Sequence, residues 1–177
     1  MNTTSRKIAL CGMMVALGAA VMLLGGVIPV MTFCSPAIAG LTLLPVLSEY
    51  GKKWALAAYV AIAALGLMLS PDKESALLFA FLGYYPVAKV GLDKIRNAPL
   101  RVAAKLMLFN VAVGLMLASI AWVFNMTEVM AEYAEMSTVM LVVFGVVANV
   151  TILLYDRMLG IAMTLYRRRL RKIVSRK

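Results

Sequence analysis

The chain has 177 residues, of which 63% are hydrophobic and only 15% are charged, and its mean hydropathy is +0.92. A soluble domain is about half apolar and a quarter charged. A chain of this length has too little interior to bury the excess, so the composition excludes an ordinary soluble domain and predicts one integral membrane domain over 1–177.

Six apolar segments follow one another along the chain, and a helix needs about 20 such residues to cross a bilayer. The first is too long for the apolar part of a signal peptide, so we expect a retained transmembrane helix. The second is short. It crosses if its ends lie at the interfaces, and the alternative is a re-entrant hairpin. The prediction is an all-α polytopic protein with six transmembrane helices, at about 8–31, 35–50, 53–69, 75–92, 100–125 and 137–166.

The charged residues predict the orientation of these spans. The net charge is +10, and a cytoplasmic N-terminus leaves only Lys73 of the 18 Lys and Arg residues outside. That asymmetry follows the positive-inside rule and places both termini in the cytoplasm of a multi-pass cell-membrane protein. The basic tail 167–177 is expected to contact anionic lipid, and it lacks the interleaved aromatic residues that would favour nucleic acid. Most acidic residues are expected outside: Asp72, Glu74, Glu128, Glu132 and Glu135.

The first segment carries small residues four positions apart, at Gly12, Ala16 and Ala20. Such a stripe lets another helix backbone approach closely. Two interpretations remain open: packing against a neighbouring helix of the same chain, which the spacing alone favours, or docking of a partner subunit.

The fourth segment is interrupted by Tyr84-Tyr85-Pro86, and Lys89 follows one turn later. Proline removes a backbone hydrogen bond, so we expect a kink here. Tyr84 either lines a solute site or packs at the kink. Lys89 is expected to extend its ammonium group to the inner interface.

Other polar residues lie in the last two segments. Asn110 and Asn149 either bind a ligand or join two helices, and the second is favoured. Asp156 and Arg157 are expected to be interfacial charges, with an intramembrane ion pair as the less favoured alternative.

Several motifs that support chemistry are missing from the sequence. There is no GxxxxGK[ST] loop, no GxSxG elbow and no His, and Cys11 and Cys34 lack CxxC spacing. We therefore expect no catalytic residues, no metal, no cofactor and no enzymatic activity.

The pattern resembles the substrate-binding S components of energy-coupling-factor (ECF) vitamin transporters. The similar features are the overall size, six spans with both termini inside, and the stripe at Gly12, Ala16 and Ala20. The proline-containing segments 28–30 and 44–46 and the cytoplasmic turn at 49–53 also match, and the resemblance covers roughly 7–166. One departure is the very short first external link, where many members have a longer covering loop.

This resemblance implies an S-component-like helical bundle that captures a vitamin-like solute. It implies that the stripe docks on a separate transmembrane coupling subunit and that two ATPase subunits drive transport. The residues implied for the solute site lie towards the outer half: Ser35, Asp72, Tyr84, Trp122, Asn125 and, deeper, Asn149.

A second interpretation is a non-catalytic membrane scaffold, as in cell-shape proteins of the MreD type. Such a protein would bind partners through its helices and its basic tail, and it would hold no solute. Trp122 would then be an interfacial anchor.

Overall fold

The computed structural model describes residues 3–25, 31–122 and 134–170, and these residues form helices with no β-strand among them. The predicted all-α class is confirmed. Several stretches are long and apolar enough to cross a membrane: Thr4–Gly25, Lys52–Leu69, Lys73–Leu92, Ala98–Trp122 and Thr138–Arg168. These correspond to the first and the third to sixth predicted spans.

The second predicted span is built from two short helices, α2 (Cys34–Leu41) and α3 (Leu43–Tyr50). Pro45 explains the break between them. A proline lacks the N–H that would bond four residues back, and its ring clashes with that carbonyl group. The residue four positions before Pro45 is Leu41, where α2 ends. The six-span count therefore stays a prediction.

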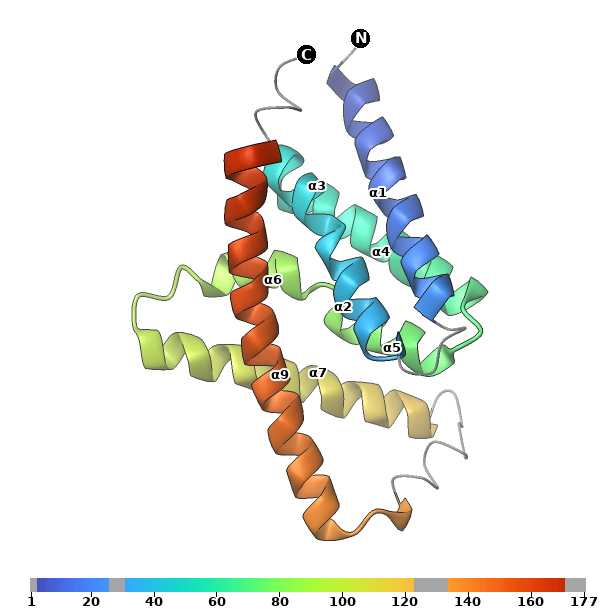
Figure 1. Cartoon of the computed structure of the whole chain (residues 1–177), viewed down its shortest axis with the longest axis vertical. Helices are drawn as coiled ribbons and strands as arrows, with labels where there is room; N and C mark the ends of the chain where they lie inside the picture. The colour runs from blue at the N-terminus through green and yellow to red at the C-terminus, as the bar shows by residue number, and fades with distance from the viewer. Residues whose placement is uncertain (1–2, 26–30, 123–133, 171–177) are drawn as a thin grey trace.

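The α2–α3 pair lies at the centre of the molecule, between α1 (Thr3–Gly25) and α9 (Thr138–Leu165) (Figure 1). Its side chains are among the most deeply buried in the structure, including Ala39, Leu43 and Val46, all with no exposed area. This segment is therefore the core of the fold.

Helix α4 (Lys52–Leu69) follows α3 after the single residue Gly51, which has φ +82°. Only glycine adopts this conformation without strain, so it permits the tight reversal. Helices α1, α2 and α4 meet in a core of buried side chains that includes Met22, Ala39 and Ile62.

The fourth predicted span also consists of two helices, α5 (Lys73–Leu82) and α6 (Tyr85–Leu92). Pro86 ends the first as Pro45 ends α2, because α5 stops at the residue four positions before it. The kink predicted from this proline is confirmed.

Helix α7 (Ala98–Trp122) runs across α9 in Figure 1. In a bundle of parallel helices the two would instead run alongside each other. The first half of α9 extends away from the other helices, and its side chains from Val139 to Val147 are exposed. Lipid is as apolar as these side chains, so such a helix needs no protein cover in a bilayer. A π-helical segment, Tyr166–Leu170, follows α9.

The start of α1, the turn between α3 and α4, and the end of α9 lie at the same end of the molecule (Figure 1). The link between α6 and α7 lies at the side of this view. The orientation relative to a membrane stays a prediction from the charged residues.

Candidate functional site

A group of charged and polar side chains is centred on the carboxylate of Asp156, which α9 places against α6 and α7. Its Oδ1 accepts from Lys89 Nζ at 2.6 Å and from Tyr85 Oη at 2.9 Å. Its Oδ2 accepts from Lys105 Nζ at 2.8 Å. Asp156 is thus bound by three donors from two other helices, and we call Tyr85, Lys89, Asp93, Lys105 and Asp156 the ion-pair network.

Asp93 is the second acid of the ion-pair network. Its Oδ1 accepts from Lys105 Nζ at 2.6 Å, and its Oδ2 lies 3.2 Å from Lys89 Nζ. The side chains of Lys105 and Asp156 are 6% and 14% exposed, whereas that of Asp93 is 42% exposed. Two lysines and two aspartates therefore balance in charge, and Asp93 is the member that faces outward.

The local sequence explains how α6 supplies its part of the network. Helix α6 starts at Tyr85 with Pro86 in its first turn, and Tyr85, Lys89 and the C-cap residue Asp93 lie at intervals of four. Residues four apart lie on one helix face, so all three reach the same place. This spacing of four is the feature of the sequence from which a shared site for these three side chains could have been predicted.

The structure shows partners for Lys89 and Asp156 that the sequence analysis does not anticipate, because the two side chains form an ion pair. Pairing offsets the desolvation of both groups. The expected position of Lys89, Asp156 and Arg157 at the inner interface stays a prediction from the sequence.

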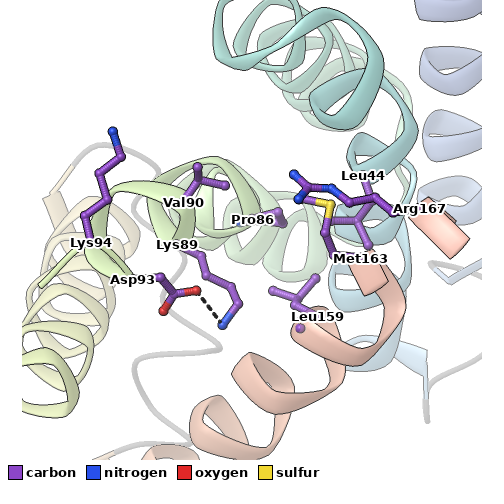
Figure 2. Close-up of a pocket in the computed structure, with 10 residues that line it drawn as sticks. Leu44, Pro86, Lys89, Val90, Asp93, Lys94, Leu159, Met163 and Arg167 are labelled. Carbon is purple, nitrogen blue, oxygen red and sulfur yellow. Dashed lines mark ion pairs between the residues drawn. The ribbon is translucent and has the colours of Figure 1, made fainter. Parts of the chain in front are cut away.

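Two pockets adjoin the network. The first has a volume of about 320 Å³, and the apolar side chains that line it include Leu44, Leu159 and Met163. Figure 2 shows the ion pair of Lys89 and Asp93 at this pocket.

The second pocket has a volume of about 480 Å³ and shares Lys89 and Asp93 with the first. Most of its lining is charged: Lys89, Asp93, Arg101, Lys105, Asp156 and Arg157, with Val102 and Leu153. We call this second space the charged pocket.

Among the described residues, those predicted for a solute site line neither pocket, and only two of them lie close to each other. Ser35 is buried, with its Oγ 2.9 Å from Ser75 Oγ. Asp72 caps α5 by accepting from the N–H groups of Glu74 and Ser75 at 3.0 and 3.2 Å. Ser35 and Asp72 are thus linked through Ser75, at the start of α5.

The other predicted solute residues have different surroundings. Tyr84 packs edge-on against Tyr59, with ring centroids 6.2 Å apart. Trp122 ends α7 and is 89% exposed. Asn125 lies outside the described residues.

Asn149 pairs with Asn110, joining α9 to α7. Asn110 Nδ2 donates to Asn149 Oδ1 at 2.8 Å, and a reciprocal contact measures 3.4 Å. This agrees with the favoured interpretation, in which the two amides connect helices.

We expect Asn149→Ala to lower the free energy of unfolding by roughly 0.6 kcal/mol, the average for interhelical hydrogen bonds in membrane proteins. Detergent unfolding followed by circular dichroism measures it. Thr151→Ala is the control, since Thr151 Oγ1 donates within its own helix, to the Val147 carbonyl. An equal loss in both variants would argue against an interhelical contribution.

Helix α1 has two different faces. Gly18 and Met22 are buried against the core, and a Cβ atom at Gly18 would lie 2.6 Å from Ile62 Cδ1. Gly12, Ala16 and Ala20 are all exposed, and a Cβ atom at Gly12 would have no atom within 4 Å. The small-residue stripe is therefore not used for packing among the described residues.

Within the described ranges, no group of three or more His, Cys, Asp or Glu residues could hold a metal ion, and Cys11 and Cys34 are free thiols. No protein-family model matches the chain, and neither a curated protein nor a solved structure matches it.

Proposed function

We propose that this protein is the substrate-capture membrane subunit of an ECF-type importer for a vitamin-like solute. In this proposal it is not an enzyme, and it docks on a separate coupling subunit that works with ATPase subunits. The observation that carries the proposal is the exposed stripe of Gly12, Ala16 and Ala20, on a membrane-length helix whose opposite face is packed. A helix free on one small-residue face can receive a second helix at close range.

The expected solute residues enter the proposal with unequal support. Ser35 and Asp72 are linked through Ser75, where α2 meets α5. Asn149 is already paired with Asn110, so its role in solute binding has less support.

Bulky substitution on the stripe tests the docking step. We expect Gly12→Phe to weaken recovery of the coupling subunit by roughly five- to a hundredfold, because a misfit side chain in a packed contact costs about 1–3 kcal/mol. The protein itself should stay folded, since a Cβ atom at Gly12 meets nothing. Quantitative mass spectrometry of the complex, purified in mild detergent from its own host, measures the effect.

Gly114→Phe is the matched control, because Gly114 is also exposed in the middle of a long apolar helix with open space at its Cβ position. Unchanged recovery with Gly12→Phe, or an equal loss with the control, would contradict docking through the stripe.

The same preparation tests the alternative scaffold function. A bound vitamin-sized molecule with an ATPase pair favours import, whereas an empty protein with envelope-assembly factors favours the scaffold.

A further inference from the structure

We propose that the charged pocket, where α6, α7 and α9 meet, binds a phosphate-bearing anion through Arg101 and Arg157. This inference does not depend on the proposed transport function. The charged pocket is large enough for such a group, at about 480 Å³.

The charge balance of the pocket is the first argument. Lys89 and Lys105 are balanced by Asp93 and Asp156, which bind them at 2.6 to 3.2 Å. Arg101 and Arg157 line the same pocket, and among the described residues neither takes part in an ion pair. The pocket thus has two positive charges in excess.

The type of cation is the second argument. A guanidinium group presents a planar fork of donors that matches two oxygens of a phosphate. Basic pockets between membrane helices are also a recurring site for phosphorylated headgroups. A phosphate monoester or diester therefore fits a pocket lined by two arginines better than a single carboxylate would.

Asp93 gives the proposal its most specific consequence. It is the exposed acid of the network and binds both lysines. The positive charges of the pocket would attract an anion to this place, and the negative charge of Asp93 would repel it. Removing its charge would not leave the lysines unpaired, because Asp156 binds Lys89 at 2.6 Å and Lys105 at 2.8 Å. Asp93→Asn should therefore increase the affinity of the pocket for an anion.

The experiment uses the full chain in mild detergent, stripped of lipid, with two phosphate sources. Native mass spectrometry measures binding of phosphatidylglycerol against phosphatidylcholine, and equilibrium dialysis measures binding of labelled inorganic phosphate. We expect one bound anion per chain and a loss of roughly tenfold or more for the double variant Arg101→Gln/Arg157→Gln, since it removes charge-assisted hydrogen bonds. We expect Asp93→Asn to bind several-fold more tightly than the native chain, because it removes a like charge from the pocket.

The matched control is Arg96→Gln/Arg168→Gln, which removes the same net charge from exposed residues that line neither pocket. Binding of phosphatidylglycerol alone identifies a lipid headgroup, and binding of inorganic phosphate as well identifies the anion itself as sufficient. An equal loss in both double variants, or no stoichiometric binding of either source, would overturn the proposal. If the pocket variant does not fold, Asp93→Asn decides alone, and unchanged or weaker binding rejects it.

Discussion

Replacing Asp156 with leucine is expected to lower the free energy of unfolding by about 3 kcal/mol, because removing one partner of a buried ion pair leaves the other charge uncompensated. The carboxylate binds Lys89, Lys105 and Tyr85, and the Lys105 side chain is only 6% exposed. In the variant, Asp93 alone would have to balance both lysines. Unfolding by SDS from a mild-detergent micelle, followed by circular dichroism, measures the loss.

Two further variants separate a charge effect from a general packing defect. Arg157→Gln changes the neighbouring exposed residue and is expected to stay within about 0.5 kcal/mol of the native chain. The double variant Asp156→Leu/Lys105→Met leaves Lys89 paired with Asp93, so it should recover to within about 1 kcal/mol of the native value. A double variant as unstable as the sum of its single changes would contradict the assigned charge balance.

The helical class and most of the element boundaries could be predicted from hydropathy and proline positions. Long apolar segments are specific to membrane helices, and each proline acts locally on the carbonyl group four residues before it. Pro86 was predicted to interrupt its span, and it does. Pro45 acts in the same way, although 35–50 is expected from hydropathy to form one span.

The ion-pair network could not be predicted from the pattern of charges. Counting Lys and Arg for orientation treats each cation as a marker of a membrane side and says nothing about its partner. Asp156 is 67 residues from Lys89 and 51 from Lys105 along the chain, so only the packing of α6, α7 and α9 brings them together.

The positions of the expected solute residues also depend on how the helices pack, which the sequence pattern does not give. They were placed towards the outer ends of spans, as in the bundle that the resemblance implies, but α7 runs across α9 (Figure 1). Trp122 and Ser35, which are expected at similar depths in the membrane, therefore do not come together, and neither of them lines either of the two pockets.

Substituting alanine for Gly25 is expected to lower the free energy of unfolding by about 2 kcal/mol, which is typical of an atom forced into a filled space. An added Cβ atom would lie 2.2 Å from both Cβ and Oγ of Ser35. Ser35 is only 1% exposed, and its hydroxyl group is bonded to that of the buried Ser75. It cannot move without disturbing the contact between α2 and α5, so the end of α1 requires glycine.

Gly114→Ala is the matched control, because its added Cβ atom would meet nothing within 4 Å in the middle of α7. We expect that variant to gain about 0.5–1 kcal/mol, because alanine favours a helix over glycine. Ser35→Gly in the Gly25→Ala background removes both contacting atoms and should restore part of the loss. If Gly25→Ala instead behaves like Gly114→Ala in the same unfolding measurement, the close approach of α1 to Ser35 does not constrain the fold.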